Sequence, residues 1–154
     1  MRTERTWSRS PVPVAVIGLV LTGCGGSGGG TFEARPNLGI TADDSDYGTM
    51  LFDENGQAIY LFDKETSDDA QCYGDCAAAW PPVLTEGAPE ASGEVDAGLL
   101  GTTERDDGSM QVTYNGHPLY FYADEGPGEV LCHDVDDFGG TWLVVTPEGE
   151  AAPV

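Results

Sequence analysis

The sequence has very few basic residues. Its 154 residues include 6 Lys and Arg against 27 Asp and Glu, which gives a net charge of −21 at pH 7. Beyond the first ten positions, only Arg35, Lys64 and Arg105 are basic. So negative a chain is repelled by phosphate backbones and by anionic lipid, which excludes nucleic-acid binding and electrostatic adsorption to a membrane. The charge suits a solvated acidic surface or a cationic partner.

Recognisable catalytic motifs are also missing. The chain contains no G-x-S-x-G, no H-E-x-x-H and no phosphate-binding loop. Aspartates cluster at 43–46 and 134–137, but neither cluster has the glycine and terminal glutamate of an EF-hand loop. We interpret both clusters as solvated acidic faces, and we expect the protein not to be an enzyme.

The one long apolar run, PVPVAVIGLVL at 11–21, is too short to span a bilayer as a mature helix. It follows Arg2, Arg5 and Arg9 and ends in LTGC, which together predict a secretory signal over residues 1–23. Because the cleavage point precedes Cys24, we expect a lipoprotein signal rather than an ordinary one with a chance cysteine. The mature chain would then carry palmitate-type acyl chains on Cys24, anchored at the outer face of the cell membrane.

The mature chain, 24–154, is long enough for one domain. Cleavage removes three arginines and one glutamate, so the net charge falls from −21 to −23. Glycines at 25–30 and the polar, turn-rich residues that follow predict a lipidated flexible tether over 24–46. Ordered structure is expected over 47–147, followed by a disordered tail over 148–154.

The ordered region contains an internal duplication. NGQAIYLF at 55–62 corresponds to NGHPLYFY at 115–122, and residues 48–72 align with 108–132 without a gap. A shift of two residues beyond this stretch aligns Trp80 with Trp142. We therefore predict a first repeat at 47–84, a connection at 85–107 and a second repeat at 108–147, related by a pseudo-twofold axis.

Each repeat carries the signal of a β-hairpin. Asn-Gly between apolar runs predicts a type I′ turn, because both turn positions need positive φ. The strand after each turn is apolar on both faces and is expected to be central in a sheet. The only helix expected is short, at 74–80, and Pro81 and Pro82 end it. The fold class is therefore mainly β: a small single domain of two hairpin repeats with one short helix.

Both repeats share an aromatic and acidic pattern. Its members are Tyr60, Phe62 and Glu65, and Tyr120, Tyr122 and Glu125. With CYGDCAAAWPP and FGGTW, this pattern resembles the secreted-repeat lipoproteins named for a Yx(FWY)xxD motif, over about residues 47–147. That family ends its motif with Asp, whereas both copies here have Glu. The resemblance implies a domain of unknown function and no catalytic residues. The aromatic residues could line a ligand site, but their strand positions favour a core role.

Lipidation of Cys24 leaves three thiols, at Cys72, Cys76 and Cys132. An extracytoplasmic compartment favours disulfides. Cys72 and Cys76 are close enough in sequence to bridge, and this is the favoured pairing. A bridge from Cys72 or Cys76 to Cys132 stays open, because Cys72 and Cys132 are repeat equivalents that could meet near the pseudo-twofold axis.

His133 follows Cys132 directly, so Cys72, Cys76, Cys132 and His133 form an alternative set of soft metal ligands for zinc or copper. Their spacing is not that of a common zinc motif, and the absence of C-x-x-C-H excludes covalent haem attachment. We expect a non-catalytic binding or structural module of the cell envelope, without a cofactor, that meets the membrane through its lipid and an unknown protein or small-molecule partner. The alternative is a redox or metal- or haem-handling protein that uses these four residues.

Overall fold

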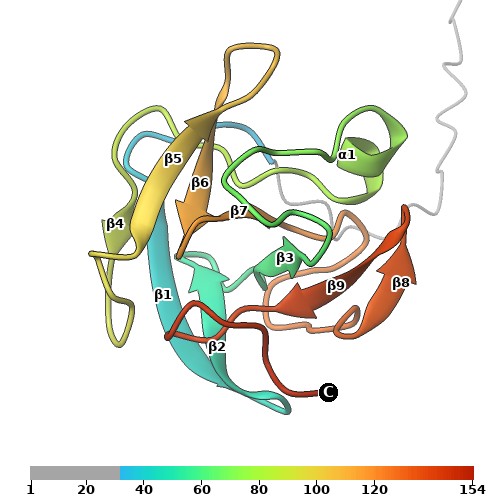
Figure 1. The fold of residues 1–154 in the computed structure, drawn as a ribbon. Helices are drawn as coiled ribbons and strands as arrows, with labels where there is room; N and C mark the ends of the chain where they lie inside the picture. Colours follow the sequence, from blue (N-terminus) through green and yellow to red (C-terminus); the bar gives the residue numbers. More distant parts are fainter. Residues whose placement is uncertain (1–31) are drawn as a thin grey trace, which may run out of the picture.

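The computed structural model describes residues 32–154, and the regular secondary structure of this part is almost entirely β (Figure 1). Residues 1–31, which hold the predicted signal peptide, Cys24 and most of the predicted linker glycines, lie outside the described part. The elements are β1 (Gly39–Ser45), β2 (Gly48–Asp53), β3 (Tyr60–Phe62), α1 (Asp75–Ala79), β4 (Glu90–Ala91), β5 (Leu100–Glu104), β6 (Met110–Tyr114), β7 (His117–Tyr120), β8 (Val135–Asp137) and β9 (Gly140–Val144). The predicted mainly β domain with one short helix is confirmed.

The strands form two sheets. One has three strands in the order β2-β1-β4, and the other has six in the order β5-β6-β7-β3-β9-β8. The strands β3 and β7, which carry the duplicated aromatic pattern, lie side by side at the middle of the larger sheet. Their central position fits their apolar sequence on both faces.

The two repeats are interleaved. Tyr60 of β3 lies opposite Tyr120 of β7 in the antiparallel register. On its other side Tyr60 pairs with Val144 of the second repeat, and Tyr120 forms the equivalent bridge with Pro82 of the first. At these two tyrosines each central strand therefore lies between segments of the opposite repeat, while β7 also pairs with β6 of its own repeat near the turn. The pseudo-twofold relation passes through the β3–β7 pair.

The two Asn-Gly turns differ. Asn115 and Gly116 both have positive φ, 49° and 78°, between the paired residues Tyr114 and His117, as the predicted type I′ turn requires. At the first Asn-Gly turn, Gly56 has positive φ but Asn55 does not, and the Asp53 side chain accepts hydrogen bonds from the backbone of Asn55 and Gln57. The prediction of a type I′ turn at 55–56 is therefore wrong. The aspartate side chain stabilises a longer loop there.

Buried side chains gather into two clusters. The first includes Leu38, Ile40, Leu51, Ile59, Val83, Val112 and Leu119. The second, which we call the aromatic cluster, includes Phe52, Tyr60, Phe62, Trp80, Tyr120 and Trp142. Together they supply two apolar cores, one on each side of the central strands.

The predicted tether boundary at residue 46 is wrong. Residues 39–45 form β1, which pairs with the whole of β2 and with β4. Further upstream, the Phe32 ring lies 5.4 Å from that of Phe121, and Arg35 forms ion pairs with Asp53 and Glu54. Of the β1 residues only Ile40 is fully buried, so backbone pairing rather than an apolar pattern determines this strand.

The predicted surface connection and the predicted tail also contain ordered structure. Residues 85–107 include β4 and β5, and β5 pairs along its length with β6. In the tail, the Ala152 backbone N–H donates to the carbonyl of Val144 and the Ala152 side chain is buried. The expectation that 148–154 is disordered is wrong, because this segment adds backbone hydrogen bonds beyond β9. No helix among residues 32–154 is long and apolar enough to cross a membrane.

Candidate functional site

The tyrosines and glutamates of the duplicated pattern form two crossed hydrogen bonds. The Tyr60 hydroxyl donates to Glu125 Oε1 at 2.7 Å, and the Tyr120 hydroxyl donates to Glu65 Oε1 at 2.7 Å. Each tyrosine therefore binds the glutamate of the other repeat. The aromatic positions lie in the core, and the acidic residue of the motif serves as their hydrogen-bond acceptor.

Both glutamates are almost completely buried, with 1% of Glu65 and 0% of Glu125 exposed. A backbone N–H also reaches each carboxylate, from Gln71 to Glu65 and from Leu131 to Glu125. Within residues 32–154, Oε2 of neither glutamate has a hydrogen-bond partner. Burial raises the pKa of both carboxyls above the ordinary value.

Burial, followed by the charge of the bonded glutamate, likewise raises the pKa of the two phenols. Tyr60 and Tyr120 therefore keep their hydroxyl protons at neutral pH. The arrangement presents two phenol–carboxylate pairs shielded from water.

The rings of the aromatic cluster form a stacked column. Trp80 and Trp142 lie face to face, with centroids 4.0 Å apart and planes 1° apart. Phe62 stacks on the outer face of Trp142 at 4.2 Å, and Tyr122 lies 4.8 Å from Trp80. We call Phe62, Trp142, Trp80 and Tyr122 the aromatic column.

The two buried tyrosines meet the column edge-on. Tyr60 lies 5.4 Å from Trp80, and Tyr120 lies 5.2 Å from Trp142. The column thus follows the pseudo-twofold relation approximately, with one tryptophan and one edge-on tyrosine at each end. Its outer rings differ, because Phe62 stacks on Trp142 whereas the Tyr122 ring is tilted by 43° against Trp80. Tyr122 is the only half-exposed member, because Phe62 and both tryptophans are buried.

Arg105 is a buried cation that the sequence did not single out. Its guanidinium donates to Gln111 Oε1 at 2.6 Å and to the Cys72 carbonyl at 2.7 Å, and lies 4.3 Å from the centre of the Tyr73 ring. Its positive charge favours the ionised form of Glu65, which partly offsets the effect of burial on the pKa of that carboxyl. The Glu129 charge acts in the opposite direction on the pKa of Glu125. The two crossed pairs are therefore electrostatically unequal.

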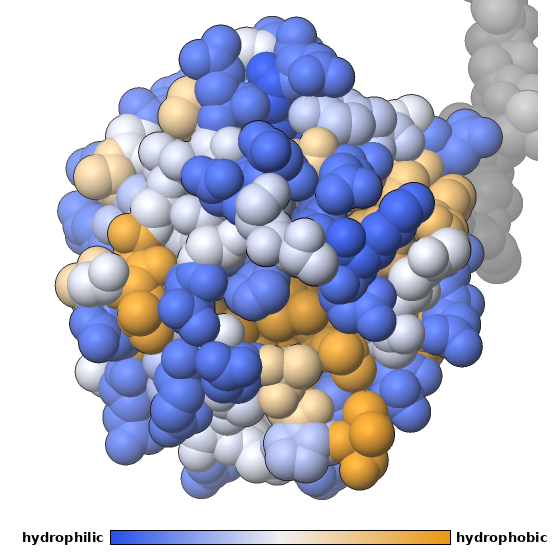
Figure 2. Space-filling view, in the orientation of Figure 1, coloured by the Kyte–Doolittle hydropathy of each residue, from blue (hydrophilic) through white to orange (hydrophobic). Residues whose placement is uncertain are grey.

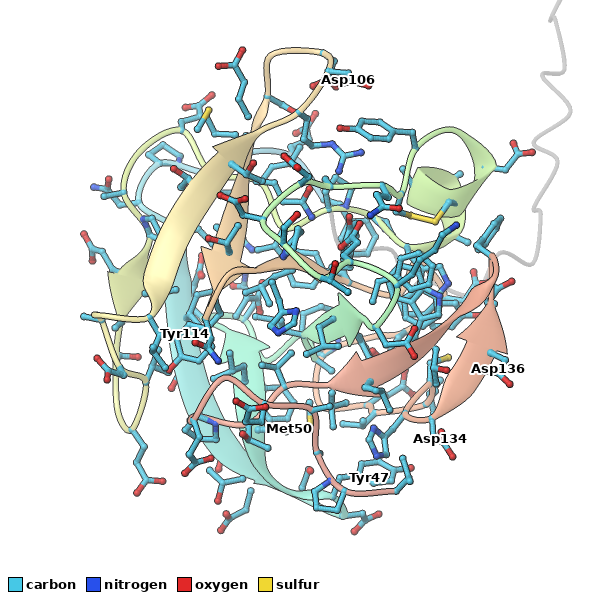
Figure 3. The ribbon with its side chains drawn as sticks, in the orientation of Figure 1. Tyr47, Met50, Asp106, Tyr114, Asp134 and Asp136 are labelled. Carbon is cyan, nitrogen blue, oxygen red and sulfur yellow. A yellow bond between two sulfur atoms is a disulfide. The ribbon has the colours of Figure 1, made fainter. Side chains whose placement is uncertain are left out.

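The favoured disulfide is present. Cys72 and Cys76 are bonded, with Cα atoms 5.3 Å apart, where α1 begins (Figure 3). Cys132 is a half-buried free thiol, so neither alternative bridge to Cys132 forms. Burial, together with the nearby Glu125 charge, raises the pKa of Cys132 to about 11. This thiol is therefore poorly suited to act as a nucleophile or a metal ligand at neutral pH.

The alternative metal set is not assembled, because the sulfur atoms of Cys72 and Cys76 are consumed in the disulfide. His133 Nδ1 accepts the Val144 backbone N–H, which leaves its Nε2 protonated and donating to the Pro153 carbonyl at 3.1 Å. Both ring nitrogens are therefore occupied. Among residues 32–154, no group of three or more His, Cys, Asp or Glu is placed to hold a metal ion.

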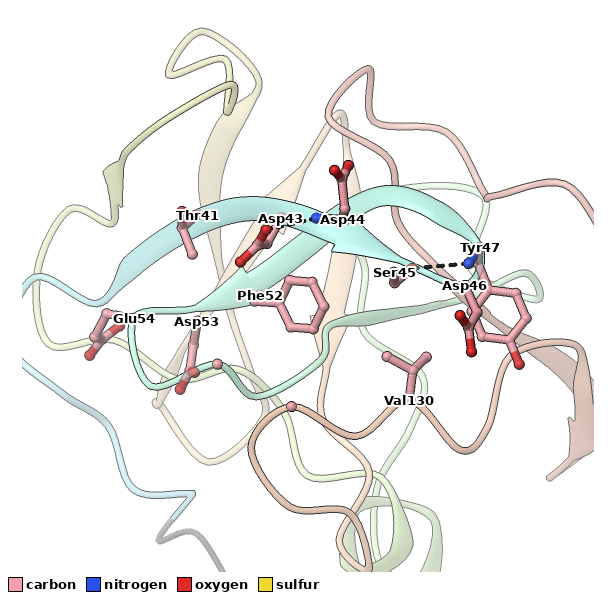
Figure 4. A pocket seen from close by; sticks show the side chains of 12 residues that line it. Thr41, Asp43, Asp44, Ser45, Asp46, Tyr47, Phe52, Asp53, Glu54 and Val130 are labelled. Carbon is pink, nitrogen blue, oxygen red and sulfur yellow. Dashed lines mark hydrogen bonds between the residues drawn. The ribbon is translucent and has the colours of Figure 1, made fainter.

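A groove of about 510 Å³ lies over the β1–β2 hairpin (Figure 4). We call it the acidic groove. Its acidic lining comprises Asp43, Asp44, Asp46, Asp53 and Glu54, and its apolar lining includes Tyr47, Phe52 and Val130. The aspartates at 43–46, interpreted from the sequence as a solvated face, thus form one wall of a concave surface. Arg35 fixes Asp53 and Glu54 through contacts of 2.6 and 2.7 Å.

The acidic groove has an open aromatic side. Tyr47 is 37% exposed at the tip of the hairpin, and its ring packs 4.5 Å from that of His133. The face shown in Figure 2 is predominantly hydrophilic, and its apolar atoms gather in separate patches. The second aspartate cluster, at 134–137, does not line the groove. The groove therefore combines negative charge with apolar area.

Comparison with protein families matches residues 41–84 and 101–146 to two copies of one family, described as a secreted repeat of unknown function. The two matched segments begin within β1 and β5, so each repeat includes the hairpin strand that the sequence-based boundaries at 47 and 108 left out. No curated protein and no solved structure matches the chain. With two matches that together span more than half of its length, the chain belongs to this family of secreted repeats of unknown function.

Proposed function

We propose that this protein is a lipid-anchored, non-catalytic binding module on the outer face of the cell membrane, and that the acidic groove binds a small amphiphilic cation. Its family is a secreted one, which indicates an extracytoplasmic location. The single observation that carries the binding proposal is the groove, which joins five carboxylate side chains to an aromatic and aliphatic lining.

The shape and lining of the groove favour a ligand with an apolar body and a positive charge. A volume of about 510 Å³ falls within the range of small-molecule sites. Tyr47 offers a ring face to a cation, and Phe52 and Val130 offer apolar contact. The net charge, −23 for the cleaved chain, attracts cations from a distance and repels anionic competitors.

The use of the duplicated motif in the core supports a non-catalytic role. Tyr60, Tyr120, Glu65 and Glu125 bind one another and are buried. A substrate has no access to these groups without unfolding part of the core. A ligand bound in the surface groove does not contact these four side chains, which stabilise the core beneath it.

The groove is tested by calorimetric titration of the full chain in detergent with benzyltrimethylammonium. Benzylsulfonate, which has a similar ring and the opposite charge, is the ligand control. We expect saturable binding of the cation and none of the anion. Asp43→Asn combined with Asp46→Asn should weaken cation binding severalfold, because each change removes a charge from the groove wall.

Asp106→Asn combined with Asp136→Asn is the matched protein control, since it removes the same charge outside the groove. Asp106 lies at the tip of the β5–β6 loop, at the end of the domain opposite Tyr47 (Figure 3). An equal loss of cation affinity in the two double variants would show that only the overall negative charge matters, and would refute the groove as the binding site. Absence of cation binding by the wild-type chain would also refute it.

The anchor is tested separately, by metabolic labelling with a palmitate analogue. Label is expected on the wild-type chain and absent from Cys24→Ser. Retention of label by the Cys24→Ser variant would contradict lipidation at this residue, whatever the outcome at the groove.

A further inference from the structure

We infer that Tyr60 and Tyr120 are a pair of reversible one-electron, one-proton redox sites, and that the aromatic column connects them to the surface at Tyr122. This activity is independent of the acidic groove. It would let the domain accept an oxidising equivalent at its surface and hold it in the core, away from water.

The proton has a fixed acceptor at each site. The Tyr60 hydroxyl lies 2.7 Å from Glu125 Oε1, and the Tyr120 hydroxyl lies 2.7 Å from Glu65 Oε1. An oxidised phenol is a strong acid, so a carboxylate already in hydrogen-bond contact receives its proton without rearrangement. Each glutamate also has a buried, unpartnered Oε2 that is free of competing donors among residues 32–154.

Oxidation at one site moves one electron and one proton. An outer-sphere one-electron oxidant removes one electron from the Tyr60 ring, and the hydroxyl proton moves to ionised Glu125. The products are a neutral phenoxyl radical, a neutral carboxylic acid and the oxidant reduced by one electron. An outer-sphere one-electron donor reverses the step, because the electron returns to the ring and the proton returns from Glu125 to the phenol oxygen. Tyr120 and Glu65 repeat the same chemistry.

The electron has a continuous aromatic path. Tyr122 lies 4.8 Å from Trp80, which lies 4.0 Å from Trp142. Tyr60 contacts Trp80 edge-on and Tyr120 contacts Trp142 edge-on, so each tyrosine directly contacts one member of the stacked tryptophan pair. Phe62, at the other end of the column, is 2% exposed and is a poor electron donor. Tyr122 is therefore the outlet of the column.

Packing alone does not require this chemistry. A phenylalanine at each tyrosine position and an aliphatic residue at each glutamate position would fill the same space. They would avoid burying two carboxylates, whose removal from water is costly. Here the costly pair occurs twice, and in both copies it lies edge-on to a tryptophan. The repeated combination of proton acceptor, phenol and stacked indoles is the observation that supports a redox role.

The test is photo-oxidation of the full chain in detergent with ruthenium tris-bipyridine and persulfate, followed by freezing and electron paramagnetic resonance. We expect a slowly decaying neutral tyrosyl signal. The signal should be lost in the Tyr60→Phe/Tyr120→Phe double variant, and each single variant should lose one of two contributions. Trp80→Phe should slow formation of the signal by removing the stacked indole.

Tyr47→Phe combined with Tyr73→Phe is the matched control. Tyr47 is exposed, Tyr73 is half-buried, and neither hydroxyl donates a hydrogen bond to a carboxylate among the described residues. The slow signal should persist in this control. Loss of the signal in the control, or its persistence in the Tyr60→Phe/Tyr120→Phe variant, would overturn the inference. If the double variant does not fold, the two single variants decide, since unchanged signals in both would equally overturn it.

Discussion

Tyr60 and Tyr120 are register partners in the antiparallel pair β3–β7, and each donates its hydroxyl to the glutamate that follows the other. Neither repeat can satisfy its own tyrosine and glutamate without the other in place. Because Tyr60 and Tyr120 also pair on their other sides with Val144 and Pro82 of the opposite repeat, the two repeats form one cooperative unit.

Removing either tyrosine hydroxyl should destabilise the domain. Tyr60→Phe or Tyr120→Phe keeps the ring but deletes a hydrogen bond to a buried carboxylate, which costs about 2 kcal/mol of unfolding free energy. Urea denaturation at pH 7 measures the change through the midpoint. Tyr47→Phe is the control, since Tyr47 is exposed and should change stability by less than about 0.5 kcal/mol. Equal midpoints for all three variants would contradict the role of the crossed pairs.

The buried glutamates should make stability depend on pH. Because burial raises the folded-state pKa of Glu65 and Glu125, the folded protein binds these protons more tightly than the unfolded chain. Their contribution is complete below the ordinary pKa of 4.5 and is lost as the pH rises through the higher folded pKa. The free energy of unfolding should therefore fall with rising pH in the window that begins near 4.5.

Glutamine variants isolate this effect from the repulsion among surface carboxylates. Glu125→Gln should flatten the fall, because burial raises the pKa of the carboxyl that this variant removes and the Glu129 charge raises it further. Glu86→Gln, at an exposed position, removes one carboxylate from the surface and should leave the fall unchanged. An identical pH profile in Glu125→Gln and wild type would exclude a raised pKa at this carboxyl.

Duplication made the central part of the fold predictable from the sequence. Repeated apolar strands after two Asn-Gly turns identified β3 and β7, and the short helix before Pro81 was placed nearly to the residue. The crossing of the hydrogen bonds could not be predicted. Because both repeats carry the same tyrosine and glutamate, bonding within a repeat and bonding between repeats are indistinguishable in sequence.

Elements that depend on backbone pairing were missed. Polar β1 buries only Ile40 fully, so its apolar pattern is too weak to mark a strand. The acidic groove escaped prediction for a related reason. Its walls come from the hairpin tip at 43–47 and from the distant residues Gly128 and Val130, which only the folded chain brings together. Arg105 gave no sequence signal, because its partners are a glutamine and a backbone carbonyl.

Cys132 should react slowly with iodoacetamide in the native protein. Its pKa is raised from the ordinary 9.0 to about 11, chiefly by burial, so its thiolate fraction at pH 8 falls by roughly a hundredfold. Mass spectrometry after timed labelling gives the rate at this residue, and the same measurement in urea gives the unfolded reference. The native rate should keep rising up to pH 10. A native rate that levels off below pH 9 would mean that the thiol is not perturbed.

The ordered C-terminal segment can be tested by comparing two glycines. Gly116 and Gly149 both have positive φ, 78° and 80°, so alanine costs about 1 kcal/mol at either from backbone conformation alone. A Cβ at Gly116 meets nothing within 4 Å, whereas a Cβ at Gly149 collides with the Asn115 side chain, whose Nδ2 donates to the Gly149 carbonyl. Gly149→Ala should therefore lower the urea midpoint more than Gly116→Ala. If residues 148–154 were disordered in solution, Gly149→Ala would instead leave the midpoint at the wild-type value.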